Sequence, residues 1–502
     1  MFARNCRRKS SFLELVGFVP PESDFVSAVA ILCGALAASS GCVHADGDSG
    51  RNDDSTSSID SSPDSETVED TNVAVVDADQ PLQLLPMPGQ NVVLLQVDTL
   101  RADHFGAYGY SRVTTPQLDA LPWLAVTGER STAPWTLPST ASQMTGLSPQ
   151  HHELLFFYTG HAANGPLHGV TFQERLQDKG YQTGLFSGND VVSDYNGVAI
   201  GFDTNVQLIK GTAGGGPNGG GSLAALGGEA LTWIDSLPPG KPFYIHLQPM
   251  NMHQTLVVPD EDLALFSSPS FAIPKNPVGG YDDDDFLTAY LDAANSTERE
   301  NVHQSVIDLY DGAMYGLDRE AAEFIAGLDS RGLLANTTIV LTADHGETLD
   351  DERDMYWNHG GTLREELTRI PLLILQPGGA ASAQTCVSSN VDLWPTLWGA
   401  MGYEALEGLD GVDLANGCRT EAQTNRFESD GVTDASAGNE VGKVSVNCAQ
   451  GLALGTNRGE GADVAEVTPA SGVNGGAGLS VAVANQLGEI KLLLGGADCQ
   501  FE

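Results

Sequence analysis

The chain has 502 residues, enough for one large α/β domain and a smaller companion. It carries 66 acidic against 24 basic residues, which gives a net charge of −42 at pH 7. This excess argues against nucleic acid as a partner and against electrostatic binding to anionic membranes, because the phosphates of both attract basic side chains.

The first 42 residues have the pattern of an export signal. Basic residues come first, and the apolar run that follows over 25–38 is too short to span a membrane comfortably. Gly41-Cys42 resembles the processing site of a bacterial lipoprotein, with Cys42 as the lipidated first residue. We therefore expect residues 1–41 to be a signal peptide and the protein to be exported and lipid-anchored to the bacterial cell envelope, in the periplasm or at the cell surface. Simple cleavage and secretion is the alternative.

Residues 42–86 are expected to form a disordered acidic linker. The stretch from Asp46 to Asp79 is rich in Asp, Ser, Thr and Glu and poor in aromatic residues. A segment of this composition buries too little apolar surface to fold. Contact with a membrane is thus expected only through the lipid anchor at Cys42.

Two apolar segments far apart in the chain each end in an acidic residue. Asn91–Val97 is a near-continuous apolar run followed by Asp98, and a second run over 338–343 is followed by Asp344 and His345. Such runs are typical of a parallel sheet covered on both faces. Ligands bind beyond the carboxyl ends of these sheets, so Asp98, Asp344 and His345 are predicted to converge there.

A third segment supplies a hydroxyl. Thr136 stands two residues before Pro138, and residues able to form a helix follow. Proline is favoured in the first turn of a helix, which places Thr136 at a helix N-terminus, where free N–H groups favour anions. Its oxygen would complete a cation site with the two aspartates and the histidine. The alternative is that Thr136 only caps its helix.

Helices and strands alternate through the middle of the chain, which predicts parallel βαβ units. Asn189, just past one strand, is placed either to contact substrate or to form a turn. His246, inside another, is predicted to be a core histidine. The expected segments are helices over 118–125, 169–179 and 302–328 and strands over 182–186 and from 242 toward 253.

The cysteines suggest disulfide bonds in an exported protein. Cys6 and Cys33 would leave with the signal, and Cys42 would carry lipid. The four that remain allow three pairings into two bridges, and they are Cys386, Cys418, Cys448 and Cys499.

The chain resembles the sulfatase family of the alkaline phosphatase superfamily. Six segments occur in the family's order over roughly 88–400, namely 97–110, 114–119, 136–140, 342–347, 359–373 and 391–397. The resemblance implies an α/β fold with an alkaline-phosphatase-like, mostly parallel sheet flanked by helices, forming a catalytic domain over 87–400. It also implies a smaller C-terminal antiparallel β subdomain over 401–502, with strands expected at 443–447, 451–455 and 490–494.

The resemblance also implies roles for single residues. His253 and His359 would bind the ester oxygens and exchange a proton with the leaving group. The nucleophile would be Thr136, activated by one divalent metal ion. By resemblance this ion is calcium, with manganese, magnesium or zinc as alternatives. Its ligands would be Asp98, Thr136, Asp344 and His345.

The nucleophile departs from the family's pattern. Sulfatases use a cysteine or serine converted to formylglycine, within a Cys/Ser-x-Pro-Ser-Arg motif, whereas Thr136 and Thr140 stand at the first and last of these positions. Threonine is not a substrate for that conversion, which favours phosphoester chemistry. We expect a sulfatase-like metal-dependent hydrolase of small-molecule or glycan sulfate or phosphate esters. The alternatives are a transferase of phospho-headgroups onto envelope glycan or lipid, and a non-catalytic surface protein that retains the fold.

Overall fold

The computed structural model describes a large part of the chain after residue 73. The described residues are 74–76, 80–155, 167–209, 221–276, 279–349, 359–361, 363–428, 439–447, 452–456, 479–485 and 488–494. All of them fall within one compact unit, Thr71–Glu502. The predicted signal peptide, Cys42 and most of the predicted linker lie outside the described residues.

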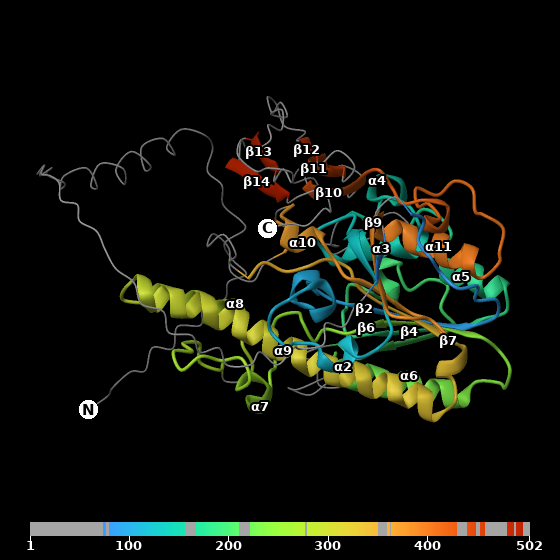
Figure 1. The fold of residues 1–502 in the computed structure, drawn as a ribbon, viewed down its shortest axis with the longest axis horizontal. Coiled ribbons are helices and arrows are strands. Elements are labelled where there is room, and N and C mark those ends of the chain that lie inside the picture. Colours follow the sequence, from blue (N-terminus) through green and yellow to red (C-terminus); the bar gives the residue numbers. More distant parts are fainter. Residues whose placement is uncertain are drawn as a thin grey trace, which may run out of the picture. The chain divides into compact units, whose positions relative to one another are not determined.

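A nine-stranded sheet forms the centre of the fold (Figure 1). Strand β8 pairs antiparallel with both of its neighbours, and the other pairings within this sheet are parallel. The expected mostly parallel sheet is therefore confirmed. In sheet order its strands are β1 Ala74–Val76, β9 Ser382–Ser389, β3 Leu124–Arg130, β8 Leu372–Leu375, β7 Thr337–Ala343, β2 Asn91–Val97, β6 Phe243–Gln248, β4 Gln182–Ser187 and β5 Thr204–Gln207.

Helices cover both faces of this sheet, which explains the near-continuous apolar character of β2. Val93 and Leu95 pack into the core that is shared with α6 (Leu223–Ser236) and α9 (Ser296–Ser330). Val92 and Leu94 point the other way, into a second core with α5 (Phe172–Asp178) and α11 (Leu393–Ala400). Successive side chains of a strand alternate between faces, so an inner strand covered on both sides carries apolar residues on both faces.

Helix α9 confirms the long helix expected over 302–328 and extends it at both ends. Its first turn is capped by Asn295, whose side-chain oxygen accepts hydrogen bonds from the N–H groups of Thr297 and Glu298 at 3.0 and 3.1 Å. The remaining described α-helices are α2 Pro116–Asp119, α3 Thr136–Thr145, α4 Pro149–His152, α7 Asp260–Leu263, α8 Asp283–Asp292 and α10 Glu365–Thr368. Among the described helices, none combines the length and apolar character that crossing a membrane requires.

The helix expected over 118–125 is wrong. The structure has the single turn α2, and strand β3 begins at Leu124. Pro122 accounts for the difference, because it lacks an N–H and disfavours the helical conformation of the residue before it.

Part of the stretch expected to be a disordered linker is a strand. Ala74–Val76 forms β1 at the edge of the sheet, in parallel register with Ser382–Gln384 of β9. The local run is apolar and β-branched, and β9 offers it an unpaired edge, so its pairing overrides the polar composition around it.

The chain closes with small antiparallel sheets, as the resemblance implied. β10 (Ala422–Glu428), β11 (Asn439–Asn447) and β12 (Leu452–Thr456) form one sheet, and β13 (Leu479–Asn485) pairs with β14 (Gly488–Leu494). A disulfide joins Cys386 in β9 to Cys418, just before β10. The pairing was left open by the sequence, and Cys448 and Cys499 lie outside the described residues, so the expected second bridge remains a prediction.

Candidate metal and catalytic site

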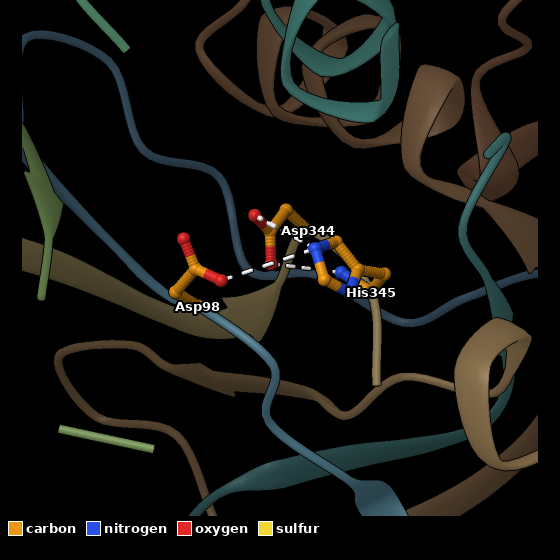
Figure 2. Close-up of side chains that lie close together, drawn as sticks. All are labelled: Asp98, Asp344 and His345. Atoms are coloured by element: carbon orange, nitrogen blue, oxygen red, sulfur yellow. Dashed lines mark hydrogen bonds and ion pairs between the residues drawn. The ribbon is translucent and has the colours of Figure 1, made fainter. Parts of the chain in front are cut away.

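The two acidic residues predicted to converge follow neighbouring strands in matched register. Val97, the last residue of β2, lies opposite Ala343, the last of β7. Asp98 and Asp344 therefore leave the sheet side by side, and His345 follows directly. One ligand atom from each of the three residues lies within 4.8 Å of the others, and all three side chains are fully buried (Figure 2).

One oxygen of Asp98 is held and the other is free. Oδ2 accepts a hydrogen bond from Nδ2 of Asn189 at 2.5 Å, whereas Oδ1 is buried without a hydrogen-bond partner. The amide orientation of Asn189 is fixed, because its own oxygen accepts from the N–H of Val191 at 2.8 Å. Asn189 therefore forms the turn, one of the two alternatives that the sequence left open, and it also contacts Asp98, which the sequence did not predict.

Asp344 and His345 are oriented by backbone groups. Oδ1 of Asp344 accepts from the N–H groups of Thr99 and His345 at 3.3 and 2.8 Å. Nδ1 of His345 lies 2.8 Å from the carbonyl of Gly346, which can only accept, so the ring carries its proton there. The lone pair of Nε2 then faces Oδ1 of Asp98 at 3.8 Å and Oδ2 of Asp344 at 3.6 Å. Burial lowers the pKa of His345 to about 3, which keeps the ring in its neutral, ligating form.

The donor set fits a divalent cation. Burial and the nearby charge of Asp98 raise the pKa of Asp344, as expected for two buried carboxylates that lie close together. A cation between them would compensate both charges and would give the free Oδ1 of Asp98 a partner. Carboxylate oxygens, a hydroxyl and one neutral imidazole are ligands that divalent metals accept in proteins.

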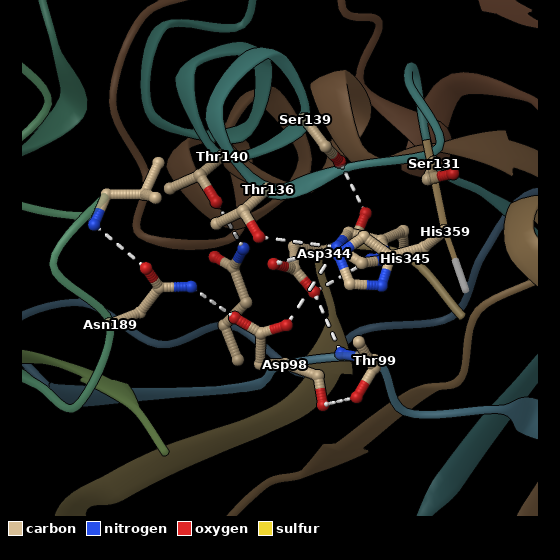
Figure 3. A network of polar contacts seen from close by, with 12 residues as sticks. Asp98, Thr99, Ser131, Thr136, Ser139, Thr140, Asn189, Asp344, His345 and His359 are labelled. Carbon is tan, nitrogen blue, oxygen red and sulfur yellow. Dashed lines mark hydrogen bonds and ion pairs between the residues drawn. The ribbon is translucent and has the colours of Figure 1, made fainter. Parts of the chain in front are cut away.

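Thr136 opens helix α3, with Trp135 as the N-cap residue and no side-chain cap. Its hydroxyl points into the cluster, with Oγ1 at 3.3 Å from Nε2 of His345 (Figure 3). The alternative that Thr136 only caps its helix is therefore wrong. Ser139, one turn on, donates to the carbonyl of Asp344 and fixes the helix start against the end of β7.

Two more histidines complete the cluster. The ring of His359 lies 4.6 Å from that of His345 and 5.1 Å from that of His253, which follows β6. Nδ1 of His359 is 3.0 Å from the buried carboxylate of Glu347. Burial alone would lower the pKa of His359, but Glu347 with Asp98 and Asp344 raises it to about 9, so His359 holds a proton near neutral pH. The structure thus brings together every predicted site residue: Asp98, Thr136, His253, Asp344, His345 and His359.

Two polar residues of the site were not singled out from the sequence. Glu347 lies in a matched segment but was given no role. Gln248 ends β6, and its amide nitrogen lies 3.4 Å from Oδ2 of Asp98 and 3.3 Å from Oδ2 of Asp344. Its place at the carboxyl end of an inner strand was the available signal. His246 is buried in the core as predicted, with Nε2 at 3.4 Å from the side-chain oxygen of Gln248.

A buried histidine, His152, forms a hydrogen bond to the helix that carries Thr136. Nδ1 of His152 accepts from the N–H of Leu154 at 3.0 Å, so Nε2 carries the proton and donates to the carbonyl of Pro138 in the first turn of α3, at 3.1 Å. Burial lowers the pKa of His152 to about 3 despite the Pro138 carbonyl, which favours the proton. The folded protein therefore holds this ring neutral.

We predict that this histidine destabilises the fold in mild acid. Below pH 6.5 the unfolded chain protonates His152 while the folded chain does not, so stability falls as the pH falls from 6.5 toward 3. Between pH 7 and pH 5 the loss is about 2 kcal/mol. Urea unfolding of the wild type and of His152→Gln at both pH values measures it, since every other group cancels in the comparison. The prediction fails if the two proteins differ by the same amount at both pH values.

Comparison with known proteins identifies similar chains. The family model named Sulfatase matches residues 90–403. Steryl-sulfatase of Rattus norvegicus is 26% identical over 406 residues, which cover 66% of this chain and 70% of that protein. Arylsulfatase of Clostridium perfringens is 23% identical over 388 residues, with 64% and 77% covered. Among solved structures, phosphonate monoester hydrolase of Agrobacterium radiobacter superposes with a TM-score of 0.56 at 19% identity, covering 73% of this chain and 87% of that one. This last likeness shows the shared fold.

Proposed function

This chain belongs to the sulfatase family, and from that premise we propose that it hydrolyses phosphate esters. The family, with its sulfatase relatives, supports an ester hydrolase of the sulfuric or phosphoric class. The observation that carries the narrower proposal is the hydroxyl of Thr136, directed at His345 where the family's sulfatases carry formylglycine. A formylglycine hydrate expels sulfate by collapsing to an aldehyde. Threonine has one hydroxyl and no such route, so water must cleave its ester.

The position of the family's motif arginine supports the same proposal. Thr140 stands there, and its hydroxyl accepts a hydrogen bond from the amide of Gln96 at 2.8 Å. Both side chains are fully buried. An uncharged, hydrogen-bonded pair therefore stands where the family's motif carries a guanidinium.

The residues would divide the reaction as follows. Asp98, Thr136, Asp344 and His345 would hold the cation, which when bound lowers the pKa of the hydroxyl and offsets charge on the transferring group. The ionised oxygen of Thr136 would attack phosphorus as the bond to the ester oxygen breaks, and His359 would give its proton to the departing alkoxide. Water then attacks the phosphothreonine, His359 takes the proton of that water, and the Thr136 alkoxide leaves. His253, beside His359, would bind an ester oxygen.

We propose one divalent cation per chain, calcium by the family resemblance. Oδ1 of Asp98 has no hydrogen-bond partner, and Oδ2 of Asp344 faces His345 and lies 3.3 Å from the amide nitrogen of Gln248, so these two oxygens are the ones proposed to bind the cation. With Thr136 and His345 the protein supplies four ligand atoms. Calcium takes six to eight ligands and magnesium six, so substrate and water oxygens would complete either shell, whereas zinc usually takes four. The metal therefore has to be identified by measurement.

The wider setting is proposed from sequence alone. The substrate is proposed to be a small-molecule or glycan ester, and the protein is proposed to be exported and anchored by lipid at Cys42, with secretion as the alternative. Mass spectrometry of the mature N-terminus would distinguish these, because only the anchored form carries acyl chains on Cys42.

The function is tested on metal-stripped protein reconstituted separately with calcium, manganese, magnesium and zinc. Nitrophenyl phosphate, a nitrophenyl phosphodiester and nitrophenyl sulfate share one leaving group, so their rates compare the transferred groups directly. We expect a cation to restore turnover and a phosphate ester to exceed the sulfate ester by at least about tenfold, or about 1.4 kcal/mol in the barrier. Faster sulfate turnover contradicts the phosphate preference, and no turnover of any ester contradicts hydrolysis.

A further inference from the structure

The loop that carries His359 is held from two sides. Gly360, the next residue, donates its N–H to the carbonyl of Pro134 at 2.8 Å, in the segment that leads to Thr136. Its own carbonyl accepts from Nε of Arg426 at 3.2 Å. Gly360 has a φ of +78°, a conformation that favours glycine and turns the loop between these two contacts. The nucleophile segment and Arg426 therefore both fix the backbone beside His359.

Arg426 belongs to β10, the first strand of the C-terminal sheets, and its neighbours hold the nucleophile segment as well. Thr424 donates its hydroxyl to the carbonyl of Ser131 at 2.5 Å, and Asn425 donates its N–H to the carbonyl of Thr132 at 2.8 Å. Both Thr424 and Asn425 are buried. Three consecutive residues of β10 thus contact the two segments that carry the nucleophile and the histidine acid.

We propose that Arg426 is a positioning residue for His359, through which the C-terminal strand sets the geometry of leaving-group protonation. The inference rests on the proposed role of His359 as the acid. Glu347 binds one nitrogen of the ring but leaves the backbone of the loop unfixed, and Gly360 supplies no side chain to anchor it. The guanidinium of Arg426 contacts this loop from β10, a strand of the C-terminal sheet. Its planar set of donors fixes the orientation of a hydrogen bond better than the rotatable ammonium of lysine would.

The proposal predicts a loss that depends on the leaving group. A nitrophenolate departs without a proton, whereas an alkyl alkoxide needs one in the transition state. We expect Arg426→Ala to lower the single-turnover rate of the first step, in which the leaving group departs, about 10- to 100-fold for an alkyl phosphate and several-fold less for nitrophenyl phosphate. The bound cation, measured by elemental analysis, should remain near the wild-type amount.

Matched variants distinguish a positioning role of Arg426 from a nonspecific loss of activity. Arg331→Ala removes an arginine that pairs with Asp235 at 2.8 Å outside this cluster, and it should slow neither substrate. Arg426→Lys, the milder change, should show the same selective pattern at smaller size. In a His359→Asn background, Arg426→Ala should add little, because the acid it positions is already gone.

Three outcomes overturn the proposal. If Arg426→Ala and Arg426→Lys slow both substrates equally, the arginine has only a structural role. If neither variant changes the rates, the arginine has no role in the reaction. Full additivity with His359→Asn shows that the two residues act separately. A fourth result, in which His359→Asn alone slows the first step equally for both substrates, overturns the acid role in the proposed function itself and so is distinguishable from the other three.

Discussion

Replacing Thr136 with alanine is expected to lower turnover by at least about four orders of magnitude, because loss of a nucleophile removes the whole covalent route. The fold should survive, since the hydroxyl makes no helix cap and points at Nε2 of His345. Steady-state turnover and the thermal midpoint, measured on one preparation, test both statements. Phosphothreonine at position 136, trapped by acid quench and identified by peptide mass spectrometry, would show the intermediate directly.

Two further substitutions control for this result. Thr136→Ser keeps the hydroxyl and should keep part of the activity. Thr136→Cys should not create a sulfatase, because Thr140 stands where the motif arginine would be and because no maturation enzyme is supplied. Near-normal turnover in Thr136→Ala would overturn the mechanism, whatever the substrate proves to be.

Replacing Asp344 with asparagine is expected to empty the cation site. The substitution keeps the size of the side chain but removes one of the two buried charges that a divalent cation would balance. Cation content should fall from about one per chain to near zero, since we propose a single set of ligands. Turnover should fall with it by several orders of magnitude. Elemental analysis after gel filtration measures the first effect, and the phosphate assay measures the second.

Asp318→Asn is the matched control for Asp344. Asp318 is also a buried aspartate, but it lies in α9 and accepts from the N–H groups of Gln117 and Leu118 at 3.1 and 2.7 Å. Its replacement should leave the cation content unchanged even where it lowers stability. A cation content undiminished in Asp344→Asn would contradict the proposed ligand set.

The central sheet was predictable because its signal is local. The apolar runs at β2 and β7 each end in an acidic residue, and parallel strands bring their carboxyl ends to one edge, so the proximity of Asp98 and Asp344 followed from the sequence. The failures were also local in cause. The prediction of a helix over 118–125 did not take account of Pro122. The prediction of a disordered linker did not take account of a short apolar run, Ala74–Val76, which becomes a strand because it pairs with the edge of β9.

The contacts around the catalytic groups were not predictable in the same way. Glu347 meets His359 and Asn189 meets Asp98 through loops whose paths depend on packing across the whole sheet edge. No periodicity or spacing encodes such pairs. The bond from Arg426 to Gly360 joins the C-terminal sheets to the site, and this is where the resemblance to the family had faded.

The arrangement of β10 gives the growing chain an order of events. The four proposed cation ligands have all been synthesised by residue 345, whereas Arg426 follows only later. A chain that stops before β10 would hold all four proposed ligands but would lack the contact proposed to orient the acid. Such a chain would protonate an alkyl leaving group more slowly than the chain that includes β10.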